Sequence, residues 1–271
     1  MFTLFGSAQK NSQTTQQGAL TLIDGINLRI SGPTNTETLS QFLLKHPELT
    51  EIKLYNSGNF ELPESIAKCK RLKTLSSSRS GAIKNIQILA QCENFQNLQI
   101  TECEDKASIN KISSCNNIVS LNLIELSTTP SLLGFTKLEK LHISSNKLET
   151  LPPLSECTEL KDLFIFNCPN LKTLPPLSGC TKLKQVNLSG CDNLQLTDES
   201  INELKNLELN DCYVFYPKHL KHLNIPRDIE ISSKPEPINM NPNTNPGSNP
   251  LLQTEVTTHK LAPINNSRST T

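Results

Sequence analysis

The sequence has few aromatic residues and no net charge. Only 4% of its 271 residues are aromatic and none is Trp, while 26 basic residues balance 26 acidic ones. A balanced charge of this kind does not point to nucleic acid or to an anionic membrane as a partner. With so few aromatic rings available, a folded core has to consist mainly of Leu and Ile.

The sequence also lacks the segments that mark secreted and membrane proteins. Residues 1–7 contain no basic residue and begin no apolar stretch of the about 7–15 residues found in signal peptides. No run approaches the ~18 apolar residues of a membrane-spanning helix. The cysteines number nine, which is odd, and many oxidisable thiols suit a reducing compartment. We therefore expect the protein to act in a cytosol, without a membrane partner.

All nine cysteines fall on two interleaved ladders. On the first ladder, each cysteine precedes by three residues an apolar residue that opens a strand motif; its members are Cys69, Cys92, Cys115, Cys157 and Cys180, with Phe135 and Ile201 on the missing rungs. On the second ladder, each takes the last position of L-x-x-L-x-L-x-x-N/C; its members are Cys103, Cys168, Cys191 and Cys212, with Asn146 at the same position. A period shared by every cysteine indicates one structural role, and it argues against disulfides, metal binding and catalysis.

This motif resembles the leucine-rich repeat. It opens at Leu49, Leu72, Phe95, Ile118, Leu138, Leu160, Leu183, Leu204 and Leu220. Most intervals are 20–23 residues, within the about 20–29 of the family. The resemblance covers roughly residues 20–230. It implies an α/β fold, a curved solenoid with a parallel sheet on the concave face and irregular or short-helical segments on the convex side. It also implies binding to a protein partner.

The chain divides into four predicted regions. Residues 1–19 are a flexible polar leader, residues 20–48 an N-terminal cap of strand plus helix, and residues 49–231 the repeat array. Residues 232–271 are rich in Pro, Asn, Ser and Thr and are predicted to be disordered. Capped ends predict a monomer.

Local signals place further elements within these regions. In the cap, a strand over 23–28 precedes a helix with Thr34 and Glu37 at capping-box spacing, and Pro47 ends that helix. Helical segments are expected at 62–68 and 83–91. The interval to Leu220 is short, so that final strand motif is expected to cap the C-terminal end.

Strand alternation predicts which side chains line the concave face. Most of them are small and polar; the set is Asn27, Arg29, Lys53, Tyr55, Ser76, Ser78, Gln99, Thr101, Asn122, Ile124, His142, Ser144, Phe164, Phe166, Asn187, Ser189, Glu208 and Asn210. Phe164 and Phe166 are the exception, and we expect them side by side in solvent, with His142 and Ile124 on preceding strands. Together with Tyr55 they form the predicted partner-binding site, since hot spots favour aromatic anchors. The alternative is that the two rings shield the sheet or contact the tail.

No residue pattern predicts catalysis, a cofactor or a metal site. Cys103-Glu104-Asp105 resembles the Cys-x-Asp catalytic motif of a bacterial ubiquitin-ligase family with a leucine-rich repeat substrate domain. Cys103 already has a position on the second ladder, however, and a reactive cysteine needs an activating, accessible setting. His219 and His222, with Cys212 upstream, are too few for a closed zinc site of about four ligands.

These observations favour a non-enzymatic interaction module that binds one partner protein on its concave face. The layout also resembles effectors that intracellular bacteria deliver into host cells, in which a C-terminal tail can carry the secretion signal. Two alternatives stay open. One is a substrate-recognition arm of a ubiquitin ligase or other enzyme whose catalytic part is a separate chain, and the other is a structural spacer.

Overall fold

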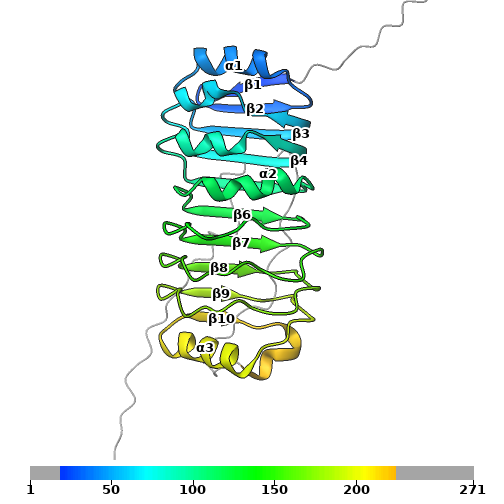
Figure 1. Cartoon of the computed structure of the whole chain (residues 1–271), viewed down its shortest axis with the longest axis vertical. Helices are drawn as coiled ribbons and strands as arrows, with labels where there is room; N and C mark the ends of the chain where they lie inside the picture. Colours follow the sequence, from blue (N-terminus) through cyan, green and yellow to red (C-terminus); the bar gives the residue numbers. More distant parts are fainter. Residues whose placement is uncertain (1–18, 224–271) are drawn as a thin grey trace, which may run out of the picture. The chain divides into compact units, whose positions relative to one another are not determined.

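Ten strands form one sheet in the order of the chain, β1 to β10 (Figure 1). The structure is a computed structural model and describes residues 19–223. These residues all belong to one compact unit, residues 1–226. None of the described residues belongs to the second unit, residues 227–271. From β2 to β10 every neighbouring pair is parallel. The predicted fold class, a leucine-rich repeat solenoid, is therefore confirmed.

From β3 to β9 the strands begin at regular intervals of 20–23 residues along the chain. Their bounds are β1 Ala19–Ile23, β2 Asn27–Ser31, β3 Glu51–Glu61, β4 Thr74–Lys84, β5 Asn97–Thr101, β6 Ser120–Ile124, β7 Lys140–Ser144, β8 Asp162–Ile165, β9 Gln185–Asn187 and β10 Tyr213–Phe215. Each strand from β3 to β9 begins two residues after a predicted motif opening. The motif positions from Leu49 to Leu183 were therefore correctly predicted.

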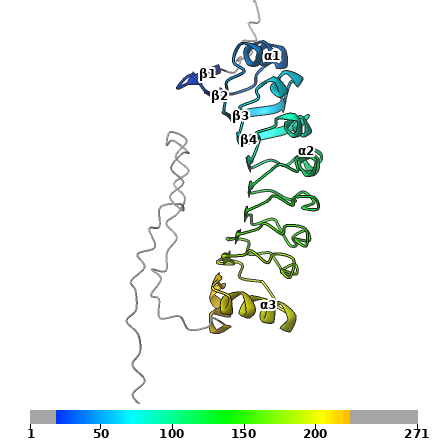
Figure 2. The same ribbon diagram turned by 90° about the vertical axis from the view of Figure 1, so that its left-hand side faces the viewer.

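The segments that return from one strand to the next lie behind the sheet (Figure 2). They contain the α-helices α1 Thr36–Lys45, α2 Lys106–Lys111 and α3 Asp198–Leu209, and the 3-10 helices η1 Glu64–Lys68, η2 Ile86–Gln91 and η3 Ile112–Ser114. A further 3-10 helix, η4 Lys218–Leu223, follows β10. The helical turns predicted near 62–68 and 83–91 are thus present as η1 and η2. None of the helices in the described part of the chain is long and apolar enough to cross a bilayer.

The cysteines of the first ladder pack consecutive return segments against each other. Its five members are fully or almost fully buried, and each Sγ lies 3.5–4.0 Å from a carbonyl oxygen one repeat earlier, as in Cys92–Ile66 and Cys180–Leu154. Cysteine suits this place because it is small and apolar and its S–H is a weak donor. Burial raises the pKa of the Cys69 thiol to about 11 and that of Cys92 to about 12.

The second ladder is confirmed at three of its five positions. Cys103 and Cys191 each place Sγ 3.2 Å from a carbonyl oxygen of the preceding repeat, and Cys168 is equally buried. Asn146 was a wrong prediction, because it is exposed and Ser145 fills the site instead. The Ser145 hydroxyl donates to the Leu126 carbonyl (2.6 Å) and accepts from the Lys147 N–H (3.1 Å). This repeat is one residue shorter than the next, so the inward-facing position comes one residue earlier.

The N-terminal cap is a hairpin plus a helix rather than one strand plus a helix. A turn at Asp24 and Gly25, both at positive φ, divides the predicted strand 23–28 between β1 and β2, which pair antiparallel. The N-cap of α1 is Asn35 rather than Thr34, and its Oδ1 accepts from the Glu37 N–H at 2.8 Å. The helix ends before Pro47, as predicted. The predicted leader and tail lie outside the described residues, apart from Ala19, which already belongs to β1.

The C-terminal end departs most from the prediction. The motif that opens at Leu204 lies in α3, and so do Ile201 and Glu208, while Asn210 is the helix C-cap. Cys212 therefore has no place on the second ladder; its N–H donates to the Leu207 carbonyl, and β10 follows at once. The predicted strand at Leu220 is the 3-10 helix η4. Neither Glu208 nor Asn210 belongs to the sheet face.

Candidate functional site

Two rows of side chains run across the centre of the sheet face from β4 to β10. The parallel register stacks the inner row, which consists of Ser76, Gln99, Asn122, His142, Phe164, Asn187 and Phe215. The outer row lies two residues further along the chain and consists of Ser78, Thr101, Ile124, Ser144, Phe166 and Ser189. Phe166 and Ser189 lie just past the ends of β8 and β9, and Thr101, Ile124 and Ser144 are buried. We call these two rows the neutral strip, because neither contains Asp, Glu, Lys or Arg.

The neutral strip is long and narrow. Neighbouring strands lie about 4.8 Å apart, so seven strands span roughly 29 Å, and two residues along a strand span roughly 7 Å. Its β4–β6 part bears hydroxyl and amide groups and Ile124, whereas all of its rings lie in its β7–β10 part, together with Ser144, Asn187 and Ser189. We call the latter the aromatic end, defined by His142, Phe164, Phe166 and Phe215.

At the aromatic end, His142 and Phe164 contact each other edge to face. Their ring centroids are 4.5 Å apart at an interplanar angle of 88°, an arrangement that the quadrupole of an aromatic ring favours. Phe164 and Phe166 project from β8 and its extension, where they flank Ile165, which is fully buried. Both rings are half-buried, so the prediction that they lie in solvent was wrong in degree. Ile124 is only 8% exposed and lies two strands away on β6, next to Ser144.

His142 is neutral at physiological pH. Burial lowers its pKa to about 4, and Lys140 acts in the same direction, while Asp162 opposes the shift. Lys140 and Asp162 lie on the strand-start side of the strip and pair with each other at 3.5 Å. The histidine therefore adds a ring to the aromatic end without adding charge.

The structure does not bring Tyr55 together with the other predicted site residues. Tyr55 lies on β3, five strands from Phe164, which corresponds to about 24 Å. Its ring lies under the Arg29 guanidinium, 4.7 Å from the ring centroid. Lys53, nearby on the same strand, pairs with Glu51 at 2.9 Å. This N-terminal part of the sheet face is charged and differs from the neutral strip.

Sequence reasoning missed the last strand of the aromatic end. Phe215 stacks next to Asn187 in the inner row, and Tyr213 on the same strand is 41% exposed. Residues 213–216 contain three aromatic residues and a Val, which is a strand signal in its own right. It was overlooked because the leucines of α3 matched the repeat motif.

Charged residues gather on a rim just beyond the outer row, at a bend within β4 and at the ends of β5 and β6. Arg79, Glu102 and Glu125 occupy equivalent turns in three successive repeats, with φ of 51°, 56° and 54°. Their left-handed conformation costs about 1–2 kcal/mol each for non-glycine residues. The turn directs the chain away from the sheet, and the Glu125 N–H donates to the Ser144 carbonyl at 2.7 Å. Arg79 pairs with Glu102 at 3.5 Å.

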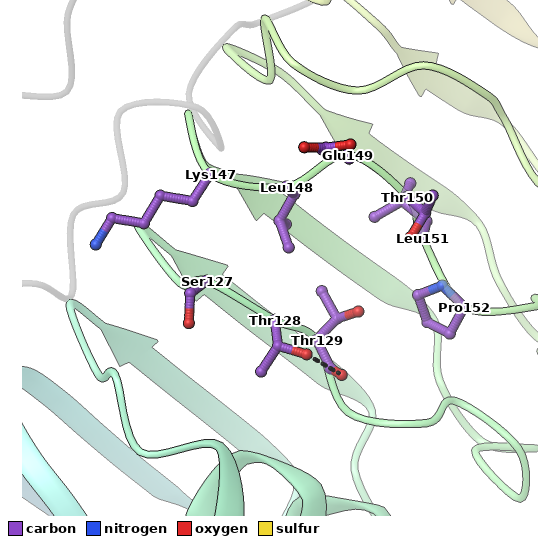
Figure 3. A pocket seen from close by; sticks show the side chains of 9 residues that line it. All are labelled: Ser127, Thr128, Thr129, Lys147, Leu148, Glu149, Thr150, Leu151 and Pro152. Atoms are coloured by element: carbon purple, nitrogen blue, oxygen red, sulfur yellow. Dashed lines mark hydrogen bonds between the residues drawn. The ribbon is translucent and has the colours of Figure 1, made fainter.

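A shallow groove of about 410 Å³ lies between two successive return segments (Figure 3). It is lined by Ser127, Thr128, Thr129, Lys147, Leu148, Glu149, Thr150, Leu151 and Pro152. The repeat that opens at Ile118 has 20 residues and the next has 22, so the shorter segment leaves space beside the longer one. Lys147 and Glu149 are held by ion pairs to Glu104 and Lys172. The groove contains no cysteine or histidine that could act as nucleophile or base.

The Cys103-Glu104-Asp105 segment has structural contacts. Cys103 is 1% exposed, and burial raises the pKa of its thiol. Asp105 is the N-cap of α2, and its Oδ2 accepts from the Ser108 N–H at 2.9 Å.

His219 Nε2 lies 3.0 Å from the Leu194 carbonyl oxygen. Among residues 19–223 no three His, Cys, Asp or Glu side chains are grouped as metal ligands.

Comparison with known proteins supports the fold. A family model described as Leucine Rich repeats (2 copies) matches residues 136–179. The leucine-rich repeat domain of the type III effector XopL is 24% identical, with 73% of this chain and 70% of that chain aligned and a TM-score of 0.54. An internalin of Listeria monocytogenes is 15% identical over 65% of this chain and 57% of its own, with a TM-score of 0.38. A leucine-rich repeat protein of Leptospira interrogans is 16% identical over 70% and 66%, with a TM-score of 0.38. No curated protein sequence matches the chain.

Proposed function

We propose that this leucine-rich repeat chain is a non-enzymatic module that binds one partner protein on its sheet face, with the aromatic end as the anchor. The observation that carries the proposal is the group of half-buried rings at Phe164, Phe166 and Phe215, which lies over core residues of a continuous parallel sheet. Large apolar side chains on a polar surface are typical of binding hot spots.

The sheet makes this anchor rigid before a partner arrives. Phe164 is flanked by Leu163 and Ile165, both fully buried, and the backbone of β8 pairs with strands on both sides. Little backbone freedom remains to be lost on association, and preorganised surfaces bind with a smaller entropic cost. Most of the affinity would then come from the few rings that a partner desolvates.

We further propose that the protein is an effector that acts in a host cytosol. Two observations support this finer proposal. Eight of the nine cysteines, from Cys69 to Cys191, are buried free thiols, which suits a reducing compartment. In addition, the fold resembles that of the leucine-rich repeat domain of a type III effector.

Affinity capture with the full-length chain tests the binding proposal. Bait protein and a Phe164→Ala/Phe166→Ala variant are compared in eukaryotic and bacterial lysates, with captured proteins identified by mass spectrometry. The control is Leu44→Ala/Leu133→Ala, because these side chains are 58% and 51% exposed and lie away from the sheet face. Circular dichroism and thermal unfolding establish that every bait is folded.

The expected result is a eukaryotic protein that the phenylalanine variant loses and the leucine variant keeps. A partner retained by the phenylalanine variant contradicts binding at the aromatic end. A partner captured only from bacterial lysate contradicts the effector role. Capture of a ubiquitin ligase subunit together with its substrate would favour the alternative, a recognition arm in an enzyme complex.

A further inference from the structure

We propose that the partner presents an uncharged, extended segment of about nine residues to the neutral strip, running across the strands from β4 to β10. The proposal rests on the proposed function, because it specifies what binds the same sheet face. About nine residues follow from the roughly 29 Å length of the strip and the roughly 3.3 Å rise of an extended chain.

The charge distribution of the sheet face selects an uncharged segment. The neutral strip offers no formal charge that could compensate a charged residue brought against it, and burying an unpaired charge is strongly unfavourable. His142 does not change this, since its pKa is about 4 and the two charged groups nearest to it, Lys140 and Asp162, pair with each other. A charged residue in the segment would lose its hydration without gaining a partner.

The width of the strip selects an extended segment over a folded surface. Charges border part of the strip on each side, with the Lys140–Asp162 pair at the starts of β7 and β8 and the rim of Arg79, Glu102 and Glu125 beside β4 to β6. The row centres lie about 7 Å apart and span about 29 Å, so with half a spacing added on every side the two rows cover roughly 450 Å², whereas a folded partner typically covers about 800 Å² on each side. A folded face that bound here would also have to cover these charged residues at its margins.

The two ends of the strip give the segment a direction. Ser76, Gln99 and Asn122 offer hydroxyl and amide groups at one end, whereas Phe164, Phe166 and Phe215 offer rings at the other. Asn122 Oδ1 lies at the boundary and, within the described residues, is buried without a hydrogen-bond donor. A rotation of its amide would let a backbone N–H of the segment supply one. The segment should therefore carry small polar residues toward β4 and apolar residues toward β10.

Peptide display with the full-length chain tests this inference. Two nonapeptide libraries are selected against the immobilised protein, one without Asp, Glu, Lys and Arg and the other with all twenty residues, and Phe164→Ala/Phe166→Ala serves for counter-selection. The expected result is enrichment from the first library of peptides with apolar residues at one end. The dissociation constants of these peptides should change less than about twofold between low and high salt, because no charges meet in the complex.

A pair of matched substitutions locates the segment on the strip. Gln99→Glu places a carboxylate in the inner row, and we expect it to weaken binding of the selected peptides at least about tenfold. Gln96→Glu makes the same change three residues earlier, at an exposed position outside the strip, and should stay within about twofold. Equal effects of the two substitutions would overturn the proposed path.

The remaining outcomes separate this inference from the proposed function. The inference is overturned if only charged peptides are enriched. It is also overturned if every enriched peptide binds the phenylalanine variant as well. If lysate capture nevertheless depends on Phe164 and Phe166, the proposed function stands and its partner binds through a folded surface. If neither capture nor display depends on these rings, both proposals fail.

Discussion

The segments that open at Leu160 and Leu204 carry the same spacing of leucine and isoleucine and fold differently. The first forms β8, and its sixth motif residue, Ile165, is fully buried. The second forms the end of α3, and its sixth motif residue, Leu209, is 72% exposed. Apolar residues at positions one, four and six fit a strand by alternation and a helix by its period, so the spacing alone does not decide.

The residues that precede each motif make the difference. Before Leu160, the Cys157 carbonyl accepts from the Leu160 N–H at 3.1 Å, which closes a turn and releases an extended chain. Before Leu204, Thr197 caps a helix with its Oγ1 accepting from the Ser200 N–H at 3.2 Å. Asp198 and Glu199 lie in the first turn, where their negative charges stabilise the helix by interacting with the positive end of its dipole. A repeat motif therefore becomes a strand only where a turn, and not a helix cap, comes before it.

The largest expected effect is on the free energy of unfolding, when the sixth motif residue of the strand segment is truncated and compared with the same truncation in the helix segment. Ile165→Ala should reduce the free energy of unfolding by about 2–5 kcal/mol, because it leaves a cavity in the core. Leu209→Ala should change it by less than about 0.5 kcal/mol, since the side chain is mostly exposed. Urea unfolding followed by circular dichroism measures both. Similar losses for the two variants would mean that the motif at Leu204 packs like a strand after all.

Within the regular repeats, His142 should make the stability of the protein depend on pH. Its folded pKa, about 4, lies below the ordinary histidine pKa of 6.5, so the folded state binds the proton less readily than the unfolded chain. The stabilising contribution is therefore complete above about pH 6.5 and is lost as the pH falls toward 4. His142→Phe should flatten the fall in unfolding midpoint across that interval. An unchanged slope in this variant would show that the histidine is solvated in the folded state.

The sequence predicts the repeats well because each strand position is reinforced by several residues at once. Leu138, Leu141 and Ile143 define β7 together, and the regular period fixes the register of the sheet, hence the rows that contain Phe164 and Phe166. Features set by a single residue were less predictable. Examples are the shift from Asn146 to Ser145, which follows from repeat length, and the exposure of Phe164, which depends on neighbours in three dimensions.

A smaller effect should come from the cap that distinguishes α3 from the strands. Thr197→Ala removes the hydroxyl that accepts from Ser200 N–H and should cost about 1 kcal/mol, with a loss of helical signal in circular dichroism. Thr181→Ala is the matched control, because Thr181 is exposed and lies just before the strand motif at Leu183. We expect the control to leave both the stability and the spectrum unchanged. A spectrum unaffected by the loss of Thr197 would assign the helix to its packing and not to its cap.

An effect of similar size but opposite sign, a gain in stability, is expected at the one regular repeat whose core position is polar. Ser77 stands where Leu54 and Ile100 stand in the neighbouring strands; it is 1% exposed, and its Oγ has no hydrogen-bond partner within the described residues. A buried hydroxyl without a partner loses its hydration and gains nothing. Ser77→Ala should therefore raise the free energy of unfolding by about 1 kcal/mol, measured as a higher urea midpoint with an unchanged slope. Ser78→Ala, one residue later on the sheet face, should leave the midpoint where it is. A lower midpoint for Ser77→Ala would mean that the hydroxyl does find a partner, and that β4 is held by a polar contact where its neighbours are held by leucine and isoleucine.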